Sequence, residues 1–206
     1  MPYLLRVELP DVPGSLGRVA TAIGMAGGDI EAIEIVEKRN GAAVDDVLLE
    51  IATGTMPDSI VSACNALDGV EVIWISRYAA GGNLVLDLEA VEELTAEPEV
   101  ALDRLIDLLP ATFRADWAAR VSKNDGVSHA THAAPDELEW LAIDRAAHLE
   151  SDDENAVLIG ARLNKTECVL IGRRGGPEFL DSEVARLGHL AGLAMSISRT
   201  AKQSAH

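Results

Sequence analysis

Hydrophobic and polar positions alternate along residues 3–9, which predicts a β-strand with one solvent-facing side. Its two faces are Leu5, Val7 and Leu9 on the apolar side, and Arg6 and Glu8 on the charged side. After a turn at residues 10–15, apolar residues recur at helical spacing from Leu16 to Ile23. This spacing predicts an amphipathic helix that ends at Gly27-Gly28.

Three further strands and a second helix follow the same logic. Residues 30–38 predict a strand with Ile30, Ala32, Glu34 and Val36 on one face and Ile33 and Ile35 on the other. Asn40-Gly41 tolerates the positive φ of a type I′ turn and predicts a hairpin with residues 43–51. A helix around residues 60–67 and a strand at residues 70–75 complete the order βαββαβ. This order is the ferredoxin-like α+β fold, with two helices on one face of a four-stranded antiparallel sheet.

Small residues at positions 79–83 predict a linker, so we expect one domain over residues 1–80 and another over residues 84–206. The pattern after the linker predicts a second α+β domain. Its expected elements are a helical region at 84–113 broken near Pro98, strands at 117–122 and 127–131, a helix at 137–149, a hairpin of strands 156–163 and 168–172, and a long C-terminal helix at 177–200. The second half of that last helix is apolar nearly all round, which predicts a buried or partnered surface.

Charge and composition narrow the function. The chain has 17 Lys and Arg against 34 Asp and Glu, a net charge of −17. Such a surface repels phosphate and argues against binding to nucleic acid or to an anionic membrane. Cys64 and Cys168 lie far apart in apolar runs, which indicates buried thiols rather than a disulfide. Neither a membrane-spanning run nor a signal sequence is evident, so we expect a cytoplasmic protein.

The turn before the first helix is the main candidate for chemistry. Pro13 has the φ suited to helix entry, and Gly14 permits close backbone approach. The backbone N–H groups of Gly14, Ser15 and Leu16 are then expected to lack helical partners and to form an anion site sized for a carboxylate. Asp11 can accept hydrogen bonds from an ammonium group, so the pair suits an α-amino acid. Alternatively, Asp11 is simply the N-cap of the helix.

Asp11-x-Pro13-Gly14-x-Leu16, followed by Gly27-Gly28-Asp29-Ile30 at the start of a strand, resembles the ACT domain family. The resemblance covers residues 3–78. It implies a regulatory module that binds an amino acid and pairs side by side as a homodimer, with the ligand between the first turn of one module and the second strand of its partner. It implies these ligand-binding residues: Asp11, Val12, Pro13, Gly14, Ser15, Leu16, Gly28, Asp29 and Ile30. Many members of the family have Asn at both acidic positions, and two Asp residues tolerate an ammonium well but a second anion poorly.

Residues 170–181, which end in a Phe and an Asp before the long helix, resemble the end of a GAF domain. The resemblance implies a dimerisation surface or a second small-molecule site. The cyclic-nucleotide signature of that family and a suitably placed chromophore cysteine are both missing. We expect Phe179 to be a core residue rather than part of a ligand pocket.

Two other groups are weaker candidates. His129 and His132, with Asp136 and Glu137 nearby, could form a metal site, but residues three apart in a strand do not share a face, so a solvated loop is expected. Arg173-Arg174-Gly175-Gly176 could contact a phosphate, but a solvated hairpin exit is favoured over this reading. We therefore expect no catalytic residues, no metal and no cofactor.

These observations favour a non-catalytic sensor that binds an amino acid at the interface of two N-terminal modules. Two alternatives stay open. The chain could be a scaffold or dimerisation protein without a ligand, or it could be the regulatory part of an enzyme. An enzyme would need titratable groups to converge in residues 84–201, around His129, His132 and Asp136.

Overall fold

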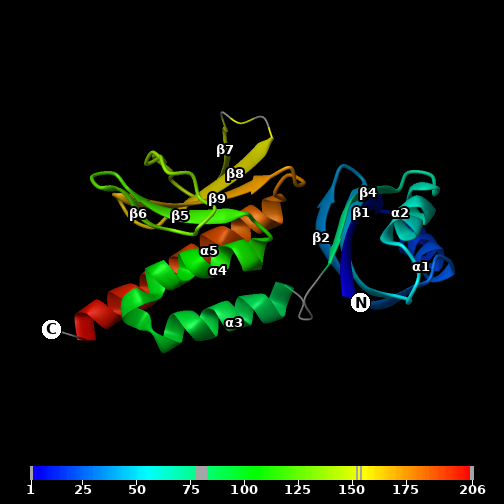
Figure 1. The fold of residues 1–206 in the computed structure, drawn as a ribbon, viewed down its shortest axis with the longest axis horizontal. Helices are drawn as coiled ribbons and strands as arrows, with labels where there is room; N and C mark the ends of the chain where they lie inside the picture. The colour runs from blue at the N-terminus through cyan, green and yellow to red at the C-terminus, as the bar shows by residue number, and fades with distance from the viewer. Residues whose placement is uncertain (1, 78–82, 152, 154, 205–206) are drawn as a thin grey trace. The chain divides into compact units, whose positions relative to one another are not determined.

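The computed structural model describes residues 2–77, 83–151, 153 and 155–204, so residues 79–82 of the expected linker lie outside the described part. The chain divides into two compact units, Met1–Gly82 and Asn83–His206. Each unit has its own sheet and its own helices (Figure 1). The structure as a whole is of the mixed α+β class that the sequence predicts.

The first unit has the expected βαββαβ order. Its elements are β1 (Pro2–Pro10), α1 (Ser15–Met25), β2 (Gly28–Arg39), β3 (Ala42–Ile51), α2 (Pro57–Asn65) and β4 (Glu71–Arg77). The four antiparallel strands lie in the order β2-β3-β1-β4, so β2 and β4 are the edges. Both helices lie on the same face of this sheet (Figure 1). They cover an apolar core that includes Leu5, Val7, Val19, Ile23, Val47 and Ile60.

The turn between β2 and β3 is the predicted one, with φ of 51° at Asn40 and 81° at Gly41. The faces of β2 differ from the prediction because the register shifts between Ile30 and Ala32. This β-bulge adds one residue, so the strand returns to the sheet with its faces exchanged. Its apolar positions now share one face: Ile30 pairs with Leu49, Ile33 with Val47 and Ile35 with Asp45.

Arg6 was expected on the solvent-facing side of β1, but it is 1% exposed. Its Nε lies 2.7 Å from Oδ1 of Asp46, and its guanidinium stands over the ring of Trp74 at 5.6 Å. Both partners lie directly opposite Arg6 in the sheet, on β3 and β4. The helix-free face therefore contains a buried, fully paired charge where the alternation of residues predicted a solvated one.

The second unit has a five-stranded antiparallel sheet in the order β6-β5-β9-β8-β7. The helices α4 and α5 cover one face of it through a shared apolar cluster that includes Leu105, Phe113, Ile171 and Leu187. The elements are α3 (Asn83–Ala96), η1 (Pro98–Val100), α4 (Ala101–Phe113), β5 (Trp117–Ser122), β6 (Gly126–Ala130), β7 (Ala147–Leu149), β8 (Ala156–Arg162), β9 (Glu167–Arg174) and α5 (Asp181–Ser204).

Two predictions for this unit are wrong. Residues 137–149 form no helix: they are irregular apart from the short strand β7. Their apolar side chains Leu138, Trp140 and Ile143 pack against the sheet face opposite the helices, and this packing overrides the local helical spacing. The described side chains of α5 are not apolar all round either, because its exposed positions are small or polar, such as His189, Gly192 and Ser196.

Candidate functional site

The turn between β1 and α1 ends at Gly14, which precedes the helix with a φ of 91°. A left-handed backbone of this kind favours glycine. An added Cβ would meet nothing within 4 Å, so it is the backbone conformation, and not a lack of room for a side chain, that favours glycine at this position. The start of α1 has no side-chain cap. Asp11 is therefore not the N-cap, and its backbone N–H instead donates to the carbonyl of Gly41 at 2.9 Å.

The side chain of Asp11 has a partner that sequence reasoning missed. Lys38 Nζ, at the end of β2, lies 2.8 Å from Oδ1 of Asp11. Both side chains are substantially exposed, at 54% for Lys38 and 40% for Asp11. The carboxylate expected to receive a ligand ammonium is thus already paired with an ammonium group of the protein.

The backbone amides at the start of α1 are only partly as predicted. The Ser15 N–H donates to the carbonyl of Val12 at 3.2 Å, so it is occupied. The Arg18 N–H donates to Gly14 at 3.1 Å. Within the described residues, no acceptor is found for the N–H groups of Leu16 and Gly17, which lie in the first helical turn. Those two donors, with the helix dipole behind them, can hold a carboxylate.

Two buried polar atoms lie in the same part of the module. Ser15 is 2% exposed and so is Asp45 on β3. Neither the Ser15 Oγ nor the Asp45 Oδ1 has a hydrogen-bond partner in the described part of the chain. Burial raises the pKa of the Asp45 carboxyl, Lys38 opposes that rise, and the charges of Asp11 and Asp46 add to it. Asp45 is thus an electrostatic neighbour of the Asp11–Lys38 pair.

Sequence reasoning missed Asp45, although it and Asp46 are adjacent carboxylates within a predicted strand. Neighbouring residues of a strand point to opposite faces, so one of the two had to face the helices. Asp46 is on the helix-free side with Arg6, whereas Asp45 pairs with Val7, whose side chain belongs to the core beneath α1 and α2. The alternation of the strand therefore places a charged residue, Asp45, at a core-facing position, and this signal could have been found in the sequence.

The predicted residues of β2 lie away from this turn. Asp29 pairs with Glu50 near the beginning of β2, whereas Lys38 pairs with Ala43 at its other end. Two bulges of β2 lie between them, and their partners on β3 are seven residues apart, which is about 23 Å of strand at the usual rise per residue. Asp29 and Ile30 therefore do not join Asp11 within one copy of the module.

The outer side of the turn is accessible. Val12, Pro13 and Gly14 are exposed, and Leu16 is partly so. An open cavity of about 410 Å³ lies along α1, bordered by Gly14, Gly17, Arg18 and Leu67 among others. The inner side, at Ser15 and Asp45, is filled by the protein's own side chains.

In the second unit, the sheet face opposite the helices is filled as well. Trp117, Val121, Ile143 and Leu170 form an apolar cluster there, with Trp140 packed against it. Two open hollows of about 590 and 500 Å³ instead lie along α5. Phe179 is 3% exposed and part of the helix-side core, as predicted.

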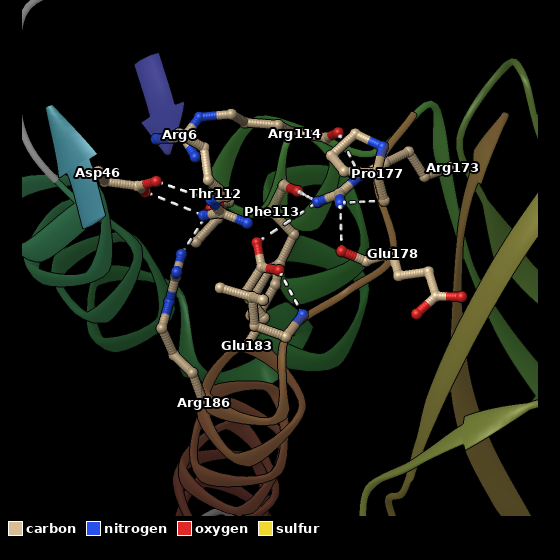
Figure 2. A network of polar contacts seen from close by, with 11 residues as sticks. Arg6, Asp46, Thr112, Phe113, Arg114, Arg173, Pro177, Glu178, Glu183 and Arg186 are labelled. Atoms are coloured by element: carbon tan, nitrogen blue, oxygen red, sulfur yellow. Dashed lines mark hydrogen bonds and ion pairs between the residues drawn. The ribbon is translucent and has the colours of Figure 1, made fainter. Parts of the chain in front are cut away.

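Arg173 is neither a phosphate contact nor a solvated residue. It is 5% exposed, and its guanidinium donates to the backbone carbonyls of Phe113, Arg114 and Pro177 at 2.7, 3.2 and 2.8 Å (Figure 2). It also stands 3.9 Å from the centre of the Phe179 ring and pairs with Glu183 of α5. The Glu183 carboxylate in turn accepts the Leu180 N–H at 2.8 Å. This network joins α4, β9 and the start of α5. Arg174, beside it, is 75% exposed and pairs with Asp153.

The residues considered for metal binding or catalysis do not converge. His129 pairs with Asp107 at 2.8 Å, while His132, Asp136 and Glu137 are exposed. The described residues contain no group of three or more His, Cys, Asp or Glu side chains that could hold a metal ion.

Cys64 and Cys168 are free and buried, and burial raises the pKa of both thiols. Among the described helices, none combines the length and apolarity needed to cross a membrane.

The first unit thus has the fold of a ferredoxin-like module with a donor-rich turn at the start of its first helix. A model of the ACT domain family matches residues 3–68, and this part of the chain is an ACT domain. Such a domain indicates a regulatory, small-molecule-binding role for the first unit. Residues of the chain are also 36% identical, over 73 positions, to NAD-dependent malic enzyme 1 of Bacillus subtilis (strain 168). That match covers 35% of this chain and 17% of the enzyme, so it concerns a small part of that protein.

Among solved structures, the chain is similar to two GAF domains of phosphoenolpyruvate-protein phosphotransferases. The one from Acinetobacter has 8% identity and a TM-score of 0.43, covering 57% of this chain and 95% of its own. The one from Coxiella burnetii has 14% identity and a TM-score of 0.44, covering 61% of this chain and 100% of its own. Likenesses at this level say nothing of a ligand.

Proposed function

We propose that the chain is a non-catalytic sensor that binds an α-amino acid at an interface between two copies of its ACT domain. The observation that carries the proposal is the start of α1, where the N–H groups of Leu16 and Gly17 lack acceptors within the described residues. These donors suit the α-carboxylate of the ligand. Carboxylates at and near the turn suit its α-ammonium group.

The distribution of the site residues supports a site shared by two copies. Asp29 and the Asp11–Lys38 pair are at opposite ends of β2, which is an edge strand of its sheet. If two β2 strands pair antiparallel about their midpoint, near Ile33 and Glu34, Asp29 of the second copy comes level with Lys38 of the first. Two equivalent sites then form, one at each end of the paired strands.

The edge itself favours pairing. β2 is 12 residues long, and Ile33 and Ile35 are 37% and 51% exposed. A long edge strand with exposed apolar side chains is a template for another strand. The same feature favours the second candidate, a dimerisation module without a ligand, because strand pairing requires no small molecule.

Thermal unfolding of the purified chain with each of the twenty standard amino acids, at up to about 10 mM, tests the ligand. A ligand present at about 100 times its Kd stabilises the folded state by roughly 2.7 kcal/mol, which is a clear rise in Tm. One or a few amino acids should produce such a rise. A flat response to all twenty overturns the amino-acid proposal, and a dimer found in that case supports the dimerisation module.

The shared site is tested by a variant of the edge strand. Ile35→Lys places a charge on β2 and is expected to weaken both self-association and the ligand-induced rise in Tm. Met56→Lys, at another exposed apolar position in the loop before α2, is the matched control. Sedimentation velocity with and without the bound amino acid gives the oligomeric state. Loss of the dimer with full retention of ligand binding contradicts a site between two copies.

A further inference from the structure

Helix α5 has an open hollow along each side of its C-terminal half. The first hollow, of about 590 Å³, lies between α5 and the end of α3 with η1, and its lining includes Thr95, Glu99 and Ile197. The second hollow, of about 500 Å³, lies between α5, the start of α4 and the β8–β9 turn, and its lining includes Met195 and Arg199. Ile197 and Met195 are apolar and only partly buried. The second unit is therefore incompletely packed on both sides of α5.

The strip of α5 that separates the two hollows is exposed, with small residues at its middle. Exposed residues follow this strip at alternating spacings of four and three: Ala185, His189, Gly192, Ser196, Arg199 and Gln203. This spacing keeps them on one line of the helix, as along the seam of a coiled coil. An added Cβ at Gly192 would meet nothing within 4 Å, so a second backbone can approach closely there. The strip has the spacing and the room for another helix to pack along it.

The two sides of α5 carry opposite charges. On the side of the first hollow, the end of α3 and η1 have four exposed carboxylates: Glu92, Glu93, Glu97 and Glu99. On the side of the second hollow, α5 has Arg199 and Lys202. Within the described residues, neither Glu99 nor Arg199 has an ion-pair or hydrogen-bond partner, and they line different hollows. Opposite charges on the two sides of one helix are complementary to those of a second copy.

Two copies can pair face to face along the strip in two ways. If their α5 helices are parallel, the two-fold axis runs along the strip, and the first hollow of each copy faces the second hollow of the other. If the helices are antiparallel, the axis crosses the strip, and each hollow faces its own kind, with carboxylates on the same side as carboxylates. Like charges placed opposite one another disfavour association. The charges therefore select the parallel pair.

We propose that the strip of α5 is an interface for a second copy of this chain, in a parallel pair with two-fold symmetry. Arg199 of each copy then lies in the first hollow of the other. Its apolar stem covers Ile197, and its guanidinium reaches Glu99. This interface requires no ligand and does not use β2, so it stands or falls separately from the proposed function.

The direction of α3 gives the parallel pair a consequence for the ACT domains. This helix runs parallel to α5, since Asp87 near its start pairs with Arg186 at 2.9 Å, whereas Thr95 near its end lines the same hollow as Ser196. Both copies of α3 in a parallel pair therefore begin at the same end. The two ACT domains that precede them are tethered at that end, which raises their effective concentration for pairing through β2.

Charge reversal tests the interface in the chain that carries Ile35→Lys, whose β2 edge is weakened. This parent should still be a dimer at about 50 µM in sedimentation velocity. Arg199→Glu or Glu99→Arg, added to the parent, should weaken the dimer at least about 10-fold, whereas the two together should return it to within about 3-fold of the parent. Arg162→Glu, exposed on the sheet face opposite the helices, is the matched control and should have no effect.

The Tm of each variant shows whether it is folded, and it should equal that of the parent because every replaced side chain is exposed. A parent that is monomeric at this concentration overturns the proposal. So does a double reversal that associates as weakly as the single variants, because the two charges would then not face one another.

Ala185→Cys and Gln203→Cys, at the two ends of the strip, test the orientation. In a parallel pair each position faces itself, so each variant should form a disulfide-linked dimer under mild oxidation. Cys64 and Cys168 are buried and do not compete. Cross-linking only between the two variants in a mixture would show an antiparallel pair and overturn the proposal. Ser59→Cys, exposed on α2, is the control, and cross-linking of this control to the same extent would also contradict the interface.

Discussion

Lys38 Nζ lies 2.8 Å from Oδ1 of Asp11, and this ion pair ties the end of β2 to the turn that precedes α1. Because both side chains are substantially exposed, its contribution to stability is small. Lys38→Met should lower the free energy of unfolding by about 0.5 kcal/mol at low salt. The loss should shrink further in about 0.5 M NaCl, where exposed charges are screened. Urea unfolding at the two salt concentrations measures it, and a loss that salt leaves unchanged would contradict a purely exposed pair.

The Arg6–Asp46 pair, drawn in Figure 2, is the opposite case. Its side chains are buried, with 1% and 3% of their surface exposed. Arg6→Met removes the guanidinium that pairs with the buried Asp46 carboxylate, and should cost about 3–5 kcal/mol. The double variant Arg6→Met/Asp46→Leu replaces both charges by apolar groups and should recover most of that loss. A double-mutant cycle in urea gives the coupling. Equal losses in the single and double variants would mean that the pair does not act as a unit.

Arg173 and Arg174 are neighbours in sequence with contrasting surroundings. Arg173 donates to four backbone carbonyls and is buried, whereas Arg174 is 75% exposed. Arg173→Lys should destabilise the second unit by about 3 kcal/mol, because one ammonium cannot reproduce the fork of a guanidinium. Arg174→Lys should change stability by no more than about 0.5 kcal/mol. Thermal unfolding of both variants makes the comparison, and similar values for the two would contradict the structural role of Arg173.

Asp45 should make stability depend on pH. Burial raises its pKa above the ordinary value of 3.8, so the folded chain holds this proton more tightly than the unfolded chain does. The contribution to stability is therefore full below the ordinary pKa and is lost as pH rises through the raised folded value. Asp45→Asn should be more stable than the wild type by about 1 kcal/mol at pH 7.

That advantage should vanish as the pH falls to the ordinary carboxyl range, because the wild-type carboxyl is then protonated and resembles the amide. Urea unfolding of both proteins at pH 7 and near pH 4 measures the difference. A variant that is less stable than the wild type at pH 7 would show that the charge of Asp45 is favourably paired. A difference that does not change with pH would point to packing instead.

The first unit could be predicted almost element by element because its signals are local. The alternation in β1, the Pro13-Gly14 entry to α1 and the Asn40-Gly41 turn each require only a few neighbouring residues. The bulge between Ile30 and Ala32 could not be predicted in this way, because it depends on how β2 aligns with β3. Because of this bulge, Ala32, Ile33, Glu34 and Ile35 lie on the faces of the sheet opposite to those predicted relative to Ile30.

The backbone of the candidate turn was predicted only in part. The positive φ of Gly14 and the free amide of Leu16 follow from the motif, whereas the Ser15 amide is occupied by Val12 and the free amide of Gly17 was not predicted. The partnership of Asp11 with Lys38 joins residues 27 positions apart, and the burial of Asp45 depends on what packs above β3. In the second unit, residues 137–149 have helical spacing, but their apolar side chains pack against the sheet. This packing belongs to the tertiary structure, and it decides against a helix.

The placement of Asp11 and Asp29 at opposite ends of β2 has a consequence for how such a sensor would respond. If each binding place is completed by a second copy, dilution empties it even when the amino acid is plentiful. The half-saturating amount of amino acid then rises as the protein becomes scarcer. The occupancy of the site would therefore depend on the concentration of the protein as well as on that of the amino acid, and the response would change with the amount of protein synthesised.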